Sequence, residues 1–180
     1  MSHTFQPLTQ EQAELIAFKW RYEGEYAFYN MDADEEDLAL FLDADERGYT
    51  TFAILDDELI GFVTLQFESV DAVSIGLGMR PDLTGSGNGH RFLTSILNWI
   101  EATYGTRTVR LAVATFNKRA IRLYVSLGFI PQDTFMQETN GGVYPFLSMA
   151  REQSEPPNKC PGVLSCPLFL LNIRKTERSN

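Results

Sequence analysis

Apolar positions in the first 46 residues are spaced as in amphipathic helices. One helix is predicted from Glu11 to Lys19, with Thr9 before it as the N-cap. A second is predicted from Asp34 to Leu42, because the acidic residues at its start suit the positive end of a helix. Aromatic residues cluster between the two helices, and their Trp and Tyr side chains either line a pocket or fill the core: Trp20, Tyr22, Tyr26, Phe28 and Tyr29.

From residue 49 the spacing changes to the alternation that is typical of strands. Residues 49–55 and 59–67 flank the polar turn Asp56-Asp57-Glu58, which predicts a β-hairpin. A third strand, Ala72 to Met79, leads into a glycine-rich loop and then a helix that ends at Gly105.

The second half of this pattern adds a strand, a helix and two further strands. We expect them at residues 109–113, 117–127, 129–138 and 143–149. The resulting order, ααβββαβαββ, predicts an α+β fold: a mixed, mostly antiparallel central sheet with helices on both faces.

Length and composition predict one globular domain, which we place at residues 1–150, followed by a C-terminal tail at residues 151–180 without an assigned role. The domain has 10 Lys and Arg against 21 Asp and Glu, whereas the tail has 5 against 3. A body with this negative charge repels nucleic acid and attracts cationic partners.

The sequence gives no indication of a membrane segment or of a metal site. No stretch offers the roughly 20 apolar residues of a membrane span, and the first residues lack the features of a signal peptide, so a cytoplasmic location is expected. With only two cysteines, Cys160 and Cys166, and two histidines, we expect no metal and no disulfide framework. Homodimerisation is left open.

Glycines alternate in the loop Gly85-Ser86-Gly87-Asn88-Gly89, between a predicted strand and a predicted helix. They permit positive φ and a close approach of the backbone to a ligand, while the first N–H groups of the helix are unpaired. Such a loop suits a phosphate or pyrophosphate. An ATPase would have Gly-Lys-Ser/Thr where this loop has Asn88-Gly89-His90, so ATP hydrolysis is disfavoured. A dinucleotide-binding loop would follow the first strand and not the third, so NAD binding is a weaker alternative. A glycine turn without a ligand is the other one.

A second motif, NKRAIRLYVSLGF, begins at residue 117. It resembles the signature N-x-x-A-x-x-x-Y-x-x-x-G-F of the GNAT superfamily of acyl-CoA-dependent N-acyltransferases, and every fixed position matches: Asn117, Ala120, Tyr124, Gly128 and Phe129. Together with the glycine loop, the resemblance implies a GNAT-like fold and an acetyl-CoA-dependent N-acetyltransferase.

The resemblance also implies roles for individual residues. Tyr124 is expected to be the general acid, because a phenol with a pKa of about 10 can donate to a thiolate whose thiol has a pKa of about 8.5. The strand before the loop is expected to splay from the next one, with Gly76 and Gly78 suited to a bulge or a close approach, and to contact pantetheine through the main chains of Leu77 and Met79. The other expected cofactor contacts are Thr84, Gly85, Ser86, Gly87, Asn88, Gly89, Asn117 and Ala120.

The chain departs from the family pattern at Thr84, where the family usually has Gln or Arg. The threonine hydroxyl can donate only one hydrogen bond to pyrophosphate, so weaker cofactor binding is expected. An ammonium substrate must lose a proton before it attacks, and Glu68 and Asp71 are either candidate bases or solvated turn residues. The acidic run from Asp32 to Glu46 either recognises a cationic acceptor or is a solvated helix start.

Two functions therefore follow from the sequence. The first is transfer of an acetyl group from acetyl-CoA to a primary amine of a small molecule or protein by direct attack, with no covalent enzyme intermediate. The alternative is a non-catalytic acetyl-CoA-binding regulatory module, and the transfer of a longer acyl group is also left open.

Overall fold

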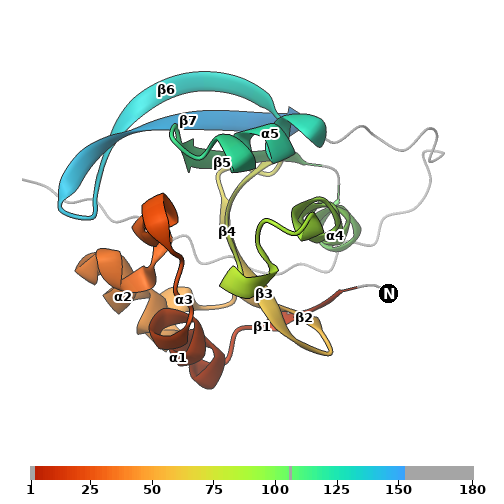
Figure 1. The fold of residues 1–180 in the computed structure, drawn as a ribbon. Coiled ribbons are helices and arrows are strands. Elements are labelled where there is room, and N and C mark those ends of the chain that lie inside the picture. Colours follow the sequence, from red (N-terminus) through yellow and green to blue (C-terminus); the bar gives the residue numbers. More distant parts are fainter. Residues whose placement is uncertain (1–2, 106, 153–180) are drawn as a thin grey trace, which may run out of the picture.

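The computed structural model describes residues 3–105 and 107–152, which form a seven-stranded sheet with helices on both faces (Figure 1). The strands are β1 (Thr4–Pro7), β2 (Thr51–Asp56), β3 (Glu58–Phe67), β4 (Ala72–Met79), β5 (Thr108–Ala114), β6 (Ile130–Thr139) and β7 (Gly142–Glu152). Their order in the sheet is β1-β2-β3-β4-β5-β7-β6, and every neighbouring pair is antiparallel except β4 and β5. The predicted fold class is confirmed.

The helical segments are α1 (Gln10–Lys19), η1 (Gly24–Tyr29), η2 (Met31–Ala33), α2 (Glu35–Leu42), α3 (Ala44–Arg47), η3 (Pro81–Leu83), α4 (Asn88–Tyr104) and α5 (Lys118–Ser126), where η marks a 3₁₀ helix. The pattern predicted α1, α2, α4 and α5. It was wrong for residues 4–7, which form β1 rather than part of a helical region. β1 has four mostly exposed residues at the edge of the sheet, so it shows no apolar alternation.

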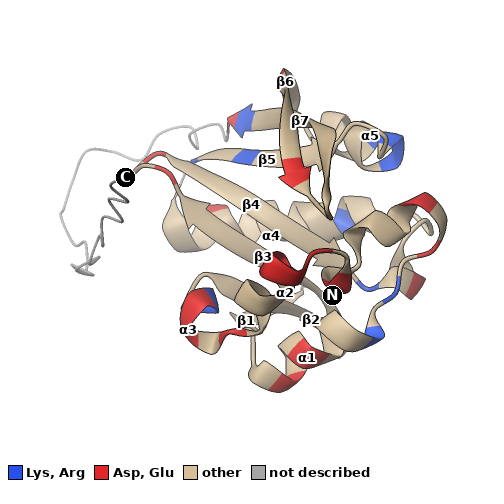
Figure 2. Ribbon diagram, turned by 90° about the vertical axis from the view of Figure 1, so that its left-hand side faces the viewer, with Lys and Arg blue, Asp and Glu red and all other residues tan. Residues whose placement is uncertain are grey.

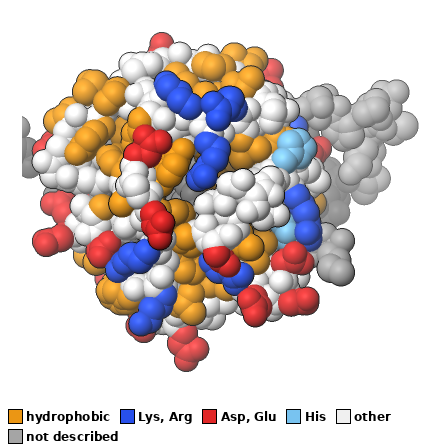
Figure 3. Space-filling model, in the orientation of Figure 1, with side chains coloured by type: hydrophobic (Ala, Val, Ile, Leu, Met, Phe, Trp, Pro, Cys, Tyr) orange, Lys and Arg blue, Asp and Glu red, His pale blue; other side chains and the backbone are white. Residues whose placement is uncertain are grey.

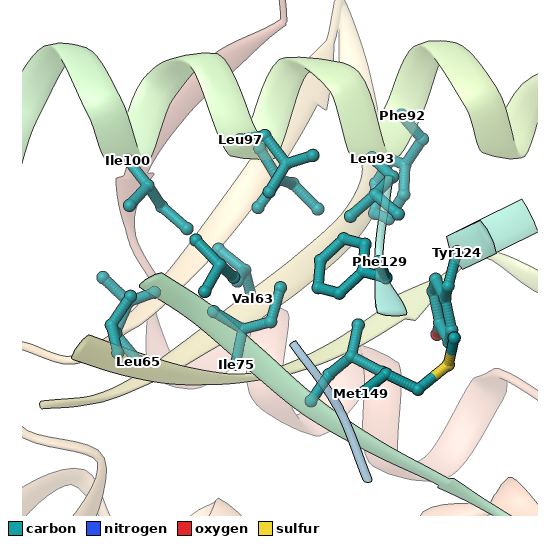
Figure 4. Packing of buried hydrophobic residues seen from close by; sticks show 14 of the residues in the cluster. Val63, Leu65, Ile75, Phe92, Leu93, Leu97, Ile100, Tyr124, Phe129 and Met149 are labelled. Atoms are coloured by element: carbon teal, nitrogen blue, oxygen red, sulfur yellow. The ribbon is translucent and has the colours of Figure 1, made fainter. Parts of the chain in front are cut away.

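Two apolar layers hold the sheet between its helices. α4 places its buried stripe on one face, where it packs on inward-facing residues of the strands (Figure 4). α1 and α2 pack on the other face, around Ala53 and Phe62 (Figure 1). Figure 4 also shows Tyr124 at the border of the first layer, beside Phe129 and Met149. The inner strands of the sheet are therefore covered on both faces, whereas the edge strands β1 and β6 are mostly exposed.

β4 and β5 separate soon after they begin. Their parallel pairing covers only Ala72–Ser74 against Thr108–Arg110, after which the two strands diverge (Figure 1). On its other side β4 remains paired with β3 from Val73 to Met79 without any shift of register. The predicted splay is confirmed, and the gap exposes one edge of β4.

The glycines of β4 serve close packing and not a bulge. The unbroken register with β3 shows that a bulge is absent from β4, so that part of the prediction was wrong. A Cβ on Gly78 would lie 2.3 Å from the ring of Phe62, and one on Gly76 would lie 2.5 Å from the Thr64 hydroxyl oxygen. Both distances are shorter than carbon atoms tolerate, so the side chains of β3 require glycine at these two places.

β7 extends to Glu152, beyond the domain end predicted at residue 150. The predicted tail, with Cys160 and Cys166, lies outside the described residues apart from its first two positions. Among the helices that the structure describes, none is long and apolar enough to cross a membrane.

Candidate active site

A cavity of about 820 Å³ lies where β4 and β5 diverge. Its walls come from β4, β5, the glycine loop, α5, the segment from α1 to α2, and the turn between β6 and β7. It brings together most of the residues predicted from sequence: Leu77, Met79, Thr84, Gly85, Gly87, Gly89, Asn117, Ala120 and Tyr124. The structure thus unites the glycine loop with the second motif around one space.

The free edge of β4 faces this cavity. The Arg80 N–H donates to the Ile60 carbonyl at 2.8 Å, so even-numbered residues of β4 direct their main-chain groups to β3. By alternation, the main chains of Leu77 and Met79 face the gap. The Met79 carbonyl already accepts a hydrogen bond from the Tyr22 hydroxyl at 2.8 Å. The Leu77 main chain and the Met79 amide are therefore the groups of this edge that a pantetheine arm can pair with.

The glycine loop leaves the start of α4 open. Gly85 and Gly87 have φ values of 79° and 83°, in the left-handed region that favours glycine. Gly87 is the N-cap residue of α4, and it offers no side chain to the first N–H groups. The other α-helices of the described residues begin with a side-chain cap, provided by Thr9, Asp34, Asp43 and Asn117. The first amides of α4 are therefore available to an anion.

Three polar residues of the loop are used differently from the prediction. The prediction was that the Thr84 hydroxyl donates a hydrogen bond to pyrophosphate. In the structure it donates to the Pro81 carbonyl at 2.8 Å. Ser86 and Asn88 do not line the cavity. The Asn88 side-chain amide instead donates to the Leu83 carbonyl at 2.9 Å, which ties the loop to the start of α4.

Tyr124 reaches the cavity from α5. Asn117 caps this helix by accepting a hydrogen bond from the Ala120 N–H at 3.1 Å, and Gly128 ends it with a φ of 86°. The Tyr124 side chain is buried, and its hydroxyl makes no hydrogen bond to another described residue. Burial, followed by the neighbouring Tyr29, raises the pKa of Tyr124. The phenol is therefore protonated at neutral pH, as a general acid must be.

The aromatic cluster of the N-terminal segment lines the cavity, and Trp20 also belongs to the core beneath α1, so both alternatives left by the sequence apply to it. Burial raises the pKa of Tyr22 to about 12 and also raises the pKa of Tyr29. The Tyr29 hydroxyl accepts a hydrogen bond from the Asn117 side-chain amide at 3.3 Å. Neutral phenols thus surround the space between Tyr124 and α2.

Two carboxylates lie at the far end of the cavity. Asp34 caps α2 and also accepts hydrogen bonds from the Asn140 N–H at 2.9 Å and the Thr139 hydroxyl at 3.2 Å. Hydrogen bonds, that of Asn140 first, lower the pKa of Asp34. Partial burial of the exposed Asp37, followed by repulsion from Asp34 and Glu36, raises the pKa of its carboxyl group. Within residues 3–105 and 107–152, Asp37 has no cationic partner.

The two candidate bases predicted from sequence lie away from this cavity. Neither Glu68 nor Asp71 contributes to its lining. The Glu68 carboxylate accepts hydrogen bonds from the Ser74 hydroxyl and from Arg110, each at 2.6 Å, and both partners lower its pKa. The interpretation of Glu68 and Asp71 as turn residues is the correct one, because the splay opens only beyond the paired start of β4.

The glycine loop, the open β4 edge and Tyr124 form the arrangement expected for an acyl-CoA enzyme, and a family comparison agrees with it. The model of the acetyltransferase (GNAT) family matches residues 13–129. The chain belongs to the GNAT family. It is accordingly an acetyl-CoA-dependent N-acyltransferase. No curated protein matches the chain in a sequence search.

Solved GNAT structures share this fold. A chimera of the Vibrio cholerae spermidine N-acetyltransferase SpeG and hSSAT superposes with a TM-score of 0.63 at 18% identity, covering 84% of this chain and 96% of the other. A putative phosphinothricin N-acetyltransferase gives 0.61 at 17% identity, covering 86% and 100%. The ribosomal-protein-S5-alanine acetyltransferase of Vibrio fischeri gives 0.57 at 14% identity, covering 84% and 93%. At these identities the likeness concerns the fold.

Sequence reasoning missed two groups of this GNAT site. Thr139, at the end of β6, and Asn140, in the turn that follows, enter the lining from a distant part of the chain. Arg119 enters it from α5 and places its guanidinium carbon 4.4 Å from the ring centre of Tyr26. Arg119 occupies a variable position of the second motif, so the motif gave no reason to select it.

Proposed function

We propose that this GNAT enzyme transfers the acetyl group of acetyl-CoA to a primary amine of a small, cationic acceptor. The observation that carries the proposal is a single cavity that extends from the uncapped start of α4, past Tyr124, to the carboxylates of Asp34 and Asp37. An anionic donor and a cationic acceptor can therefore enter from opposite ends and meet near Tyr124.

The residues of the donor end fit acetyl-CoA. The first amides of α4 and the loop at Gly85 and Gly87 suit the pyrophosphate, because they offer N–H donors without side-chain obstruction. The main chains of Leu77 and Met79 suit the amides of pantetheine. When bound, acetyl-CoA supplies the acetyl group as an activated thioester.

Direct transfer requires two actions from this chain. We assign to the Leu77 amide a hydrogen bond to the carbonyl oxygen of the acetyl group, where negative charge increases as the amine attacks. Tyr124 donates its proton to the sulfur as the C–S bond breaks, and the proton that the nitrogen loses once the N–C bond has formed restores the phenol. The amine loses its extra proton to water in the cavity or to Asp37, whose raised pKa makes it the stronger base of the two carboxylates there.

The acceptor end supports a cationic substrate. Asp37 lines the cavity without a cationic partner among the described residues, and Asp34 adds a second negative charge beside it. Tyr29 offers an aromatic ring in the lining, and aromatic faces attract ammonium groups. Several of the solved structures that share the fold are described as spermidine N-acetyltransferases, and spermidine is a polycation. These observations favour an acceptor that carries a second positive charge.

Steady-state release of CoA thiol tests the proposal. Diamines and polyamines should react with a lower KM than a neutral primary amine of similar length. Asp37→Asn should raise the KM for the diamines about 10-fold and leave the KM for acetyl-CoA unchanged. Asp45→Asn, which removes a carboxylate of α3 outside the cavity, is the matched control. Binding of acetyl-CoA without turnover of any amine would contradict the proposal and favour a regulatory module.

A further inference from the structure

The glycine loop of this chain lacks the cationic or amide side chain that its family usually places at the position of Thr84. The only hydrogen on the Thr84 hydroxyl is used within the loop, in the bond to the Pro81 carbonyl. A cofactor diphosphate would therefore meet main-chain amides here and no positive side chain from the loop itself. Its charge would be left partly uncompensated unless another element supplied a cation.

α5 supplies such a cation next to the loop. A Cβ built on Gly85 would lie 3.3 Å from Nη1 of Arg119, so the guanidinium occupies the space that a side chain on Gly85 would need. The same guanidinium lies over the ring of Tyr26. Arg119 thus lines the cavity between the glycine loop and η1.

Arg119 has no carboxylate partner among residues 3–105 and 107–152. By contrast, Arg21, Arg80, Arg91 and Arg110 all have such partners. α5 carries basic residues and no acidic ones, in contrast to the acidic α1, α2 and α3 (Figure 2). Basic side chains gather over α5 and beside a hollow on this face of the molecule (Figure 3).

We propose that Arg119 takes the place of the missing loop cation and binds the diphosphate of CoA from α5. This inference rests on the proposed function, because it assumes that the loop receives CoA. A guanidinium presents paired N–H donors that match phosphate oxygens. Stacking on Tyr26 restricts the long side chain before the ligand arrives, so less conformational entropy is lost on binding.

Calorimetric titration with CoA and with 3′-dephospho-CoA tests this assignment. Arg119→Gln should weaken the binding of both ligands by about 10-fold or more, because both contain the diphosphate. Arg122→Gln is the matched control: it makes the same change of charge on the same helix, at an exposed residue outside the cavity lining. Its affinity for CoA should stay within about twofold of the wild type.

A second experiment tests whether a cation on α5 serves the purpose that a loop cation serves elsewhere in the family. Adding Thr84→Arg to Arg119→Gln should restore most of the lost affinity. Raising the salt concentration should weaken CoA binding more in the wild type than in Arg119→Gln, because the exposed charge pair is screened. If the double variant bound CoA as weakly as Arg119→Gln alone, the result would contradict the proposal that Arg119 replaces the missing loop cation.

Three outcomes would overturn the inference while the proposed function stands. One is unchanged CoA affinity in Arg119→Gln, and another is an equal loss in Arg122→Gln, which would indicate a general effect of charge. The third is a loss for CoA but not for 3′-dephospho-CoA, which would assign Arg119 to the 3′-phosphate. If the wild type itself binds no CoA, the proposed function fails instead.

Discussion

Tyr124 is protonated at neutral pH, as a general acid must be, because even a solvated phenol has a pKa of about 10. Burial raises the pKa of Tyr124 further, and the same desolvation destabilises a thiolate beside it. Burial thus raises the pKa of the phenol and also that of the CoA thiol. Because both values rise, Tyr124 can still donate a proton to the thiolate in this site. The hydroxyl makes no hydrogen bond to another described residue, which leaves it free to donate to a ligand.

Tyr124→Phe should lower kcat by about 10²- to 10⁴-fold, the usual contribution of a general acid, with little change in the Kd for acetyl-CoA. Steady-state kinetics and calorimetry measure the two effects separately. Tyr104→Phe is the control, because it removes a partly buried hydroxyl at the other end of α4, outside the cavity. Since burial raises the pKa of Tyr124, wild-type activity should not decline through its ionisation below about pH 10. An unchanged kcat would remove Tyr124 from the chemistry.

Gly78 is a second residue whose role is set by its immediate contacts. Gly78→Ala should destabilise the fold by about 1–3 kcal/mol, because the new Cβ would meet the Phe62 ring at 2.3 Å. Denaturant unfolding measures this change. Phe62→Leu makes room at the same place, so the double variant should lose less stability than the sum of the two single changes. Additive losses would show that the two residues do not compete for the space.

At the scale of elements, sequence predicted what depends on local conformation. The glycine loop and the motif of α5 were recognised because positive φ, an open helix start and a capped helix require particular residues at fixed spacing. The bond from Tyr22 to Met79 joins residues 57 positions apart, and that from Asn140 to Asp34 joins residues 106 apart. The sequence pattern does not show such long-range contacts, so it offered the acidic run and the aromatic cluster only as alternatives, and the structure was needed to bring them to one cavity with Thr139 and Asn140.

Asp34 connects two of these elements, since it caps α2 and holds the β6–β7 turn. Asp34→Ala should lower the melting temperature and raise the KM for the amine, because the turn carries Thr139 and Asn140 of the cavity wall. The KM for acetyl-CoA should stay unchanged. Asp43→Ala is the matched control: the Asp43 side chain caps α3 and, among the described residues, accepts hydrogen bonds only from the N–H groups of Asp45 and Glu46. If Asp43→Ala changed the KM for the amine equally, the turn contact would not explain the effect.

The whole molecule separates charge along the cavity. Its net charge is −9, and acidic side chains are concentrated on α1, α2 and α3, around the proposed acceptor end (Figure 2). The basic residues of α5 lie at the proposed donor end. The net negative charge of the protein therefore attracts a cationic amine and repels CoA. Binding of the anionic donor consequently depends on local groups, which are the first amides of α4 and the guanidinium of Arg119.

Because of the buried phenols around this cavity, the free energy of unfolding of the whole protein should vary with pH in the alkaline range. Burial raises the pKa of Tyr22 to about 12, so the folded protein keeps a proton that the unfolded chain begins to release near pH 10. This contribution is fully present below about pH 10 and is lost as the pH rises towards 12. Stability must therefore fall over that window.

Denaturant unfolding of the wild type and of Tyr22→Phe across this range isolates the effect. The free-energy difference between the two proteins should be constant up to about pH 9 and should shrink above about pH 10, because phenylalanine has no proton to lose. Tyr49→Phe, which removes an exposed hydroxyl, controls for the effect of pH on the rest of the protein. A difference that stayed constant through about pH 11 would mean that water reaches the Tyr22 hydroxyl in the folded state, and the Met79 carbonyl that accepts its hydrogen bond would then also be open to water or to a ligand.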